Sequence, residues 1–373
     1  MDVNGLTVRY VDSDEKLKQA AVAWRSAALI AVDTEFMRVK TFYPNAALFQ
    51  ISDERAISLI DPTAITDLSL LTEVLAAPSV LKLMHSCSED LEVCDRHLGV
   101  LPDPLFDTQI AAAFCGHGLS VGYQRVLGDV LDLTLDKSET RTDWLQRPLS
   151  DAQLRYAAED VAWLPSLYRQ LQSQLVSASR EQWALDECVA VLERFRSRDP
   201  AAEFSSVSGA ARLSRRELAV LRSVYRWREQ TARQRNLPKN WIMSDKALLQ
   251  TAQRVPRALT DLKAIEDLSP GSRRRYGTLL VETVSDAMSL TDDALPEPLP
   301  KPLTPAQGKQ FKKMRALLNE CAEALNLAPE LLARRRDLEE IVRSGRRAQV
   351  PLFTGWRRAA CGEELLDRLE AGL

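Results

Sequence analysis

Two acidic residues, Asp33 and Glu35, follow an apolar run at residues 28–32 and are separated by a single threonine. Apolar residues bounded by polar ones predict a buried strand. Because side chains alternate along a strand, Asp33 and Glu35 should point to the same side. Neighbouring carboxylates repel each other, so burying them is costly unless a cation lies between them. Their oxygens suit Mg²⁺ or Mn²⁺, which makes the pair a candidate metal site, although a D-x-E triplet should occur roughly once by chance in a chain of this length.

A third acidic residue, Asp90, stands just past the strand predicted at residues 80–84, where the chain begins a helix. An acid at such a junction can face a cleft at the edge of a sheet. The alternative is that Ser88, Glu89 and Asp90 simply favour a helix N-terminus. Asp107 begins another helix, where we expect a helix cap or a residue that supports a metal ligand.

A tyrosine and a fourth acid, Tyr156 and Asp160, are four residues apart in a stretch with helical periodicity. This spacing places both side chains on one face of a helix and directs Glu159 elsewhere. Taken alone, such a pair is more often a half-buried tyrosine beside a solvated acid than part of a site. The four stretches must therefore be brought together by the fold before they form a site.

The elements that would position these residues change in character along the chain. Three strands joined by short polar turns predict an antiparallel meander, and alternating helices and strands then indicate a mixed α/β layer fold. Pro165 should kink the helix that begins near Ser150 or end its first segment. Later segments are helical and are separated by two linkers, predicted at residues 197–209 and in a stretch with five prolines at residues 292–305.

The composition of the 373 residues is that of a globular protein with two or three domains. No apolar run approaches the ~20 residues that span a bilayer, and the N-terminus lacks the basic and apolar regions of a secretory signal. The six cysteines show no framework spacing, so we expect reduced thiols. These features favour a cytoplasmic protein that has no membrane partner.

Charge is distributed unevenly along the chain. Residues 1–200 carry 19 Lys and Arg against 30 Asp and Glu, whereas residues 211–290 carry 16 against 8. An acidic part joined to a basic part suggests metal chemistry in one and polyanion binding in the other. The alternative is chance variation between two solvated surfaces.

The order Asp-x-Glu, a later Asp, and then Tyr-x-x-x-Asp on an α/β fold resembles the DEDD superfamily of 3′→5′ exonucleases, in its DEDDy branch. Further stretches resemble the bacterial ribonuclease D family, and the basic helical stretch around residues 227–249 resembles an HRDC domain. The stretches that carry the resemblance to ribonuclease D are residues 33–36, 85–92, 106–109, 135–139, 141–144 with 147–149, and 156–160.

This resemblance implies an α/β ribonuclease H-like nuclease domain followed by two small all-α HRDC-type domains. The expected boundaries are residues 1–205 for the nuclease domain, 206–292 for the HRDC domain, 293–305 for a Pro-rich linker and 306–373 for a second, HRDC-like helical domain. The last assignment follows from segment length and the pattern of the family.

The resemblance also implies the roles of the site residues. Asp33, Glu35, Asp90 and Asp160 correspond to carboxylates that bind two divalent metal ions, and Tyr156 should orient the attacking water. The expected partner is RNA, namely tRNA precursors and other small structured RNAs, trimmed from the 3′ end to nucleoside 5′-monophosphates. No obligate protein partner is implied.

Three basic residues, Lys137, Arg141 and Arg147, precede the Tyr156 helix and are candidates for holding substrate phosphates. The alternative is that they are solvated loop charges. In the basic helical segment, Tyr225, Trp227 and Trp241 are candidates for stacking on bases, although packing in a core is the commoner role of such aromatics. If this segment grips the RNA, removing residues 206–373 should raise KM for structured substrates.

Two other functions fit the same residues. One is a DNA-directed 3′→5′ exonuclease, but the chain has no G-x-x-x-x-G-K-[ST] loop of a helicase-linked enzyme. The other is a non-catalytic RNA-binding protein with an inert nuclease domain, which the intact acids and Tyr156 argue against. Hydrolysis of end-labelled RNA and DNA with and without metal separates the three.

Overall fold

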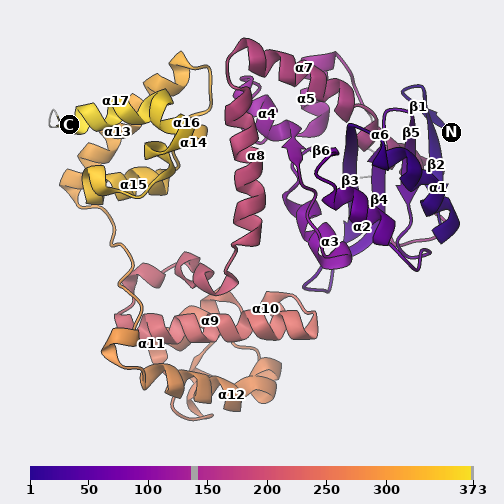
Figure 1. The fold of residues 1–373 in the computed structure, drawn as a ribbon. Coiled ribbons are helices and arrows are strands. Elements are labelled where there is room, and N and C mark those ends of the chain that lie inside the picture. Colours follow the sequence, from indigo (N-terminus) through magenta and orange to yellow (C-terminus); the bar gives the residue numbers. More distant parts are fainter. Residues whose placement is uncertain (136–141, 371–373) are drawn as a thin grey trace. The chain divides into compact units, whose positions relative to one another are not determined.

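The computed structural model describes residues 1–135 and 142–370, which form two compact units (Figure 1). The first unit contains Met1–Met37, Asn45–Arg196 and the described chain from Leu303 onward. The second contains Arg38–Pro44 and Ser197–Pro302. Among the described residues, no helix has both the length and the hydropathy needed to cross a membrane.

A seven-stranded mixed sheet forms the centre of the first unit, in the order β1-β2-β5-β4-β3-β6-β7. Strands β3, β4 and β5 form the predicted antiparallel meander, whereas β6 and β7 continue from β3 in parallel. The strands are β1 (Asp2–Val3), β2 (Leu6–Val11), β3 (Leu29–Met37), β4 (Asn45–Ser52), β5 (Ala56–Ile60), β6 (Leu81–Met84) and β7 (Leu105–Asp107).

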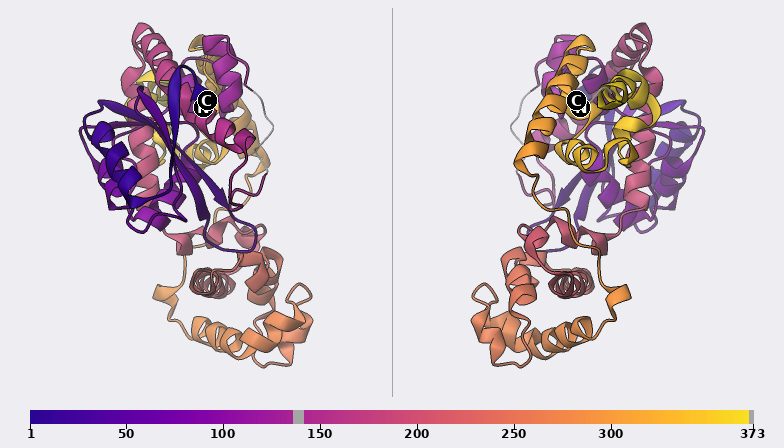
Figure 2. Two further views of the ribbon diagram at one scale, coloured as in Figure 1. Left: turned by 90° about the vertical axis from the view of Figure 1, so that its right-hand side faces the viewer. Right: turned by 90° about the vertical axis from the view of Figure 1, so that its left-hand side faces the viewer.

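Helices cover both faces of this sheet, so each face has its own apolar core (Figure 2). One core lies under the helices α1 (Asp14–Arg25), α2 (Ser69–Ala76) and α3 (Ser88–Leu98). The other lies under α4 (Thr108–Phe114), α5 (Tyr123–Leu131), α6 (Asp151–Ala162) and α7 (Leu164–Ser177), and α8 (Glu181–Arg196) packs beside α4 and β7.

The helix that carries Tyr156 and Asp160 is fixed at both of its ends. Ser150 and Gln153 form a capping box at the start of α6, which satisfies two backbone N–H groups. Pro165 lies in the first turn of α7, where its missing N–H has no helical acceptor to lose. The proline therefore ends the first segment, as the sequence predicts.

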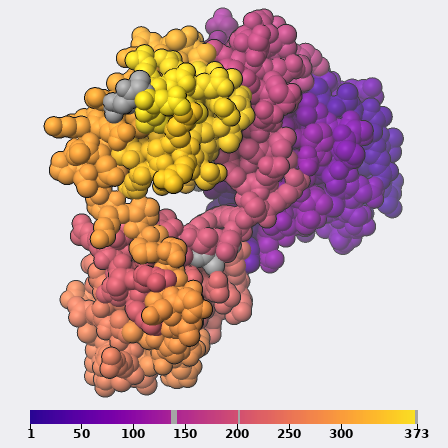
Figure 3. All heavy atoms as spheres, turned by 60° about the vertical axis from the view of Figure 1, so that its left-hand side comes forward, coloured from indigo at the N-terminus to yellow at the C-terminus, as the bar shows by residue number. Residues whose placement is uncertain are grey.

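The last helices share a core with α4, α7 and α8 of the first unit, although the sequence predicts a separate domain at residues 306–373. Trp356 stacks on Trp183 of α8 at 4.9 Å between ring centroids and meets Phe114 of α4 edge-on. In Figure 3 the yellow spheres of these helices adjoin the pink spheres of α7 and α8. The helices are α13 (Pro305–Ala324), α14 (Pro329–Leu332), α15 (Arg335–Ser344), α16 (Gly355–Arg357) and α17 (Glu363–Glu370).

The second unit is helical and has its own core. Ser214 and Glu217 form a capping box at the start of its longest helix, and Tyr225, Trp227 and Arg228 on that helix are buried. The predicted linker at residues 197–209 contains a 3₁₀ segment at Pro200–Ser206, and a shorter one at Ala210–Arg212 follows it. The helices are α9 (Arg215–Arg235), α10 (Lys239–Ile242), α11 (Asp245–Arg254) and α12 (Pro270–Met288).

Candidate active site

The first two acids lie on the central strand β3 and share one face of the sheet, as the period of two predicts. Asp33 is paired with Gln50 of β4 and Glu35 with Leu48, so both acids are held in register by the same antiparallel ladder. The ladder shifts between Glu35 and Phe36, immediately after the acids. Such a bulge bends the strand and changes the direction of the side chains beside it.

Helix α6 crosses this face of the sheet and brings the fourth acid to the first two. One carboxylate oxygen from each of Asp33, Glu35 and Asp160 lies within 4.8 Å of the others. Tyr156 donates a hydrogen bond to Asp160 one helical turn away, which matches the predicted shared face. Three partly buried carboxylates this close form a donor set that fits a divalent cation.

The third acid, Asp90, reaches the site from the opposite face of the sheet. It lies in the first turn of α3, and its carboxylate accepts a hydrogen bond of 2.5 Å from Thr34. Thr34 lies between the two β3 acids and therefore faces α3. Asp90 lies outside the group within 4.8 Å, but its charge still acts on Asp33, Glu35 and Asp160. Strand alternation could have identified Thr34 as its partner, and our sequence reasoning missed it.

Burial and neighbouring carboxylates raise the pKa values of all four acids. Burial, and then repulsion from Asp90, Asp160 and Glu35, raises the pKa of Asp33 well above its ordinary value. Burial followed by repulsion from Asp160 and Asp90 raises the pKa of Glu35 to about 9. The pKa values of Asp90 and Asp160 rise to about 7, again chiefly through burial and against the hydrogen bonds from Thr34 and Tyr156. A cation placed among them would reverse these shifts.

Asp107 is a helix cap that also ties the neighbouring loop, one of the two roles expected for it. Its carboxylate accepts hydrogen bonds from the N–H groups of Gln109 at 2.8 Å, Cys87 at 2.9 Å and Ser86 at 3.1 Å. Ser86 and Cys87 directly precede α3. Asp107 thus fixes the start of the helix that carries Asp90.

Arg147 has a protein acceptor for every donor of its guanidinium group. It pairs with the buried Asp61 at 2.5 Å and 2.8 Å and donates to the carbonyls of Trp144, Gln146 and Ala47 at 2.6–2.9 Å. A guanidinium has five N–H donors, so none is left over for a substrate phosphate. We therefore replace the expected substrate contact with a structural role, in which Arg147 holds its loop against β4.

The other two basic residues of that loop, Lys137 and Arg141, lie outside the described residues. Within the described ranges, Asp33, Glu35 and Asp160 are the only three His, Cys, Asp or Glu side chains that lie close enough together to hold a metal ion. All six cysteines are free thiols, as their spacing predicts.

Comparison with known proteins agrees with this arrangement. Residues 8–176 match the model of a 3′–5′ exonuclease family and residues 217–284 that of the HRDC domain. Ribonuclease D of Pseudomonas paraeruginosa is 42% identical over 376 residues, spanning 100% of both chains. Ribonuclease D of Escherichia coli is 36% identical over 372 residues, covering 98% of this chain and 99% of its own.

A solved structure extends the likeness to three dimensions. The crystal structure of Escherichia coli RNase D, described as an exoribonuclease involved in structured RNA processing, superposes with a TM-score of 0.90 at 35% identity. The match covers 98% of this chain and 100% of that one. Sequence, domain order and fold agree over the full length, and the chain belongs to the ribonuclease D family of exoribonucleases.

Proposed function

We propose that Asp33, Glu35, Asp90 and Asp160 hold two divalent cations, Mg²⁺ or Mn²⁺, for 3′→5′ hydrolysis of RNA that releases nucleoside 5′-monophosphates. The observation that carries the proposal is the meeting of three carboxylate oxygens within 4.8 Å, with Asp90 close enough to repel them. Bound cations of this kind lower the pKa of water and stabilise the leaving 3′ oxygen.

The protein contributes fixed positions to this reaction. The β3–β4 ladder holds Asp33 and Glu35, and Thr34 and Asp107 hold Asp90 from the other side of the sheet. Tyr156 is held beside Asp160 by its hydrogen bond and by contact with Trp144 at 6.0 Å between ring centroids. A phenol has a pKa near 10 and keeps its proton at neutral pH, so Tyr156 orients the attacking water rather than deprotonating it.

One experiment separates this function from its rivals. Purified protein is incubated with 5′-end-labelled RNA or DNA in Mg²⁺, in Mn²⁺ and in chelator, beside Asp33→Asn. We expect RNA to shorten from its 3′ end only with metal, and Asp33→Asn to be inactive. Hydrolysis of DNA alone would favour the DNA-directed enzyme. Binding without hydrolysis under every condition would favour a non-catalytic RNA-binding protein.

The substrates that we propose are tRNA precursors and other small structured RNAs, in the cytoplasm. The Escherichia coli relative acts in structured RNA processing, and this chain carries the same domains. The excess of Lys and Arg at residues 211–290 supplies the cations that bind a phosphate backbone. We assign RNA affinity to the second unit and hydrolysis to the first.

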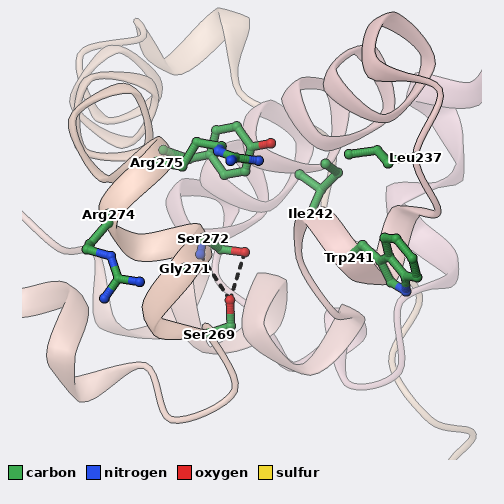
Figure 4. Close-up of a pocket in the computed structure, with 9 residues that line it drawn as sticks. Leu237, Trp241, Ile242, Ser269, Gly271, Ser272, Arg274 and Arg275 are labelled. Atoms are coloured by element: carbon green, nitrogen blue, oxygen red, sulfur yellow. Dashed lines mark hydrogen bonds between the residues drawn. The ribbon is translucent and has the colours of Figure 1, made fainter.

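A strip of side chains on the second unit, formed by Trp241, Lys263 and Arg273–Arg275, suits the binding of single-stranded RNA. Trp241 is 55% exposed and lines a hollow of about 470 Å³ with Arg274 and Arg275 (Figure 4). Arg274 also lines an adjoining hollow of about 530 Å³ with Arg273 and Lys263. Among the described residues, none forms an ion pair with Arg273, Arg274 or Arg275. An exposed indole beside unpaired guanidinium groups can stack on a base and hold the neighbouring phosphate.

Binding of a short single-stranded RNA tests this strip. In an Asp33→Asn background, which prevents hydrolysis, we expect Trp241→Ala to weaken binding about tenfold, since stacking contributes ~1–3 kcal/mol per base. Arg274→Ala should reduce the slope of log Kd against log salt by about 0.7. Arg257→Ala removes an equal charge from an exposed position outside both hollows. Equal losses in Arg257→Ala and Arg274→Ala would contradict the strip.

A further inference from the structure

We propose that Gln50 is a positioning residue: when cations are bound, its side-chain amide, which has no hydrogen-bond partner in the part of the chain that the structure describes, donates a hydrogen bond to the Asp33 carboxylate and fixes that carboxylate. The inference rests on the proposed metal-binding role of Asp33 and adds a residue to it.

Gln50 lies directly opposite Asp33 in the β3–β4 ladder. Paired residues of antiparallel strands leave the same face of the sheet, with Cβ atoms about 4.5–5.5 Å apart. The amide of a glutamine is therefore within reach of the carboxylate across the ladder. The residue opposite Glu35 is Leu48, which has no hydrogen-bonding group to offer. Asp33 is thus the β3 acid that a β4 side chain can hold.

The surroundings of Gln50 give its amide nothing else to bind. The side chain is 0% exposed, and neither amide atom has a hydrogen-bond partner among the described residues. Apart from Asp33 and Ser52, its neighbours in the ladders on this face are apolar, with Ala31, Leu48 and Leu59 in the same core. An unpartnered buried amide is destabilising, whereas an apolar side chain of the same size would avoid that cost. A polar side chain at this position therefore points to a partner in the functional state.

A carboxylate that binds a cation needs a second contact to keep its orientation. Ligating carboxylates are themselves hydrogen-bonded, and losing such outer contacts typically weakens metal affinity about 10- to 100-fold. Asp33 lies close to Glu35 and Asp160 and accepts a hydrogen bond from the backbone at Thr34. The amide of Gln50 would add a side-chain donor from the neighbouring strand.

Mn²⁺ titration calorimetry on the full chain without RNA tests the proposal. We expect Gln50→Met, which keeps the size and removes the amide, to weaken Mn²⁺ binding about tenfold. The matched control is Ser52→Ala. Ser52 lies two residues along β4, is equally buried and unpartnered, and faces Ala31 instead of an acid. The Ser52→Ala variant should bind Mn²⁺ with the affinity of the wild type. With a short RNA at saturating Mn²⁺, Gln50→Met should lower kcat and leave KM unchanged.

Thermal melting in chelator separates positioning from a role in the core. In chelator, Gln50→Met and the shorter Gln50→Leu should have melting temperatures no lower than that of the wild type, because both remove an unpartnered amide. Lower melting of both variants would overturn the proposal, as would unchanged Mn²⁺ affinity in Gln50→Met or an equal loss in Ser52→Ala. If wild type and Asp33→Asn bind Mn²⁺ equally, the proposed metal site fails and the role of Gln50 fails with it.

Discussion

At the scale of single residues, the site is defined by carboxyls that repel one another. Asp33, Glu35 and Asp160 meet on one side of the central strand, and Asp90 acts on them from the other. Burial first, and then repulsion from neighbouring carboxylates, raises the pKa values of all four acids, so ionising them without a cation is unfavourable.

The raised pKa values predict how metal-free stability depends on pH. The folded protein retains protons on these acids that the unfolded chain loses near pH ~4. The free energy of unfolding in chelator should therefore fall as pH rises from about 5 to about 9, through the pKa values of about 7 for Asp160 and about 9 for Glu35. The rise in melting temperature on adding Mg²⁺ should grow over the same range, because protons compete with the cation.

Melting curves recorded with Mg²⁺ and with chelator at each pH provide the measurement. Glu35→Gln removes one of the carboxyls whose pKa is raised, so the free energy of unfolding in chelator should fall less steeply with pH in this variant. A Mg²⁺ effect of equal size at about pH 5.5 and about pH 8.5 would show that these acids do not bind the cation.

At the scale of helices and strands, the sequence predicts whatever depends on local periodicity. Alternation along β3 places Asp33 beside Glu35, and the four-residue spacing places Tyr156 beside Asp160. The helix start at Ser150 follows from its capping chemistry. These features depend on neighbours in the chain, so a single sequence contains them.

Contacts between distant segments are not contained in local periodicity. Arg147 pairs with Asp61, 86 residues earlier, and only the fold shows that its donors are already used. From the sequence, Gln50 is only a polar residue in an apolar strand; the register of the β3–β4 ladder shows that it lies opposite Asp33. Because a sequence does not show contacts between distant segments, the role of a Lys or Arg in a loop cannot be assigned from sequence alone.

The loop contact of Arg147 yields a stability prediction. Arg147→Ala should lower the free energy of unfolding by about 3 kcal/mol, because it leaves the buried Asp61 carboxylate without its charged partner. This is the low end of such losses, since the Arg147 side chain is 25% exposed. Urea denaturation measures the change. A loss of RNA affinity with unchanged stability would instead restore the phosphate-binding role.

At the scale of the whole molecule, segments that follow one another in the sequence belong to different packed units. Residues 206–373 follow the nuclease segment as one helical stretch, but the part from Leu303 onward belongs to the first unit. Trp356 is held there by Trp183, Phe114 and a hydrogen bond of 3.2 Å from its indole to Glu187. Removing residues 206–373 would also remove side chains that complete the core of the first unit. Surface substitutions in the second unit are therefore the better test of RNA binding.

The shared core predicts that a distant tryptophan stabilises the nuclease. Trp356→Ala should cost about 3–5 kcal/mol and lower the urea midpoint at which nuclease activity is lost. Val189→Ala changes an exposed position of α8 and serves as the control. An unchanged activity midpoint in Trp356→Ala would mean that the last helices form an independent domain.

The most direct test of the account is to locate the cations. Crystals grown with Mn²⁺ and a nucleoside 5′-monophosphate should show two anomalous peaks within about 4 Å of each other, with Asp33 contacting both and Glu35, Asp90 and Asp160 completing the ligands. Manganese absent from these four carboxylates, or bound only elsewhere on the protein, would contradict it.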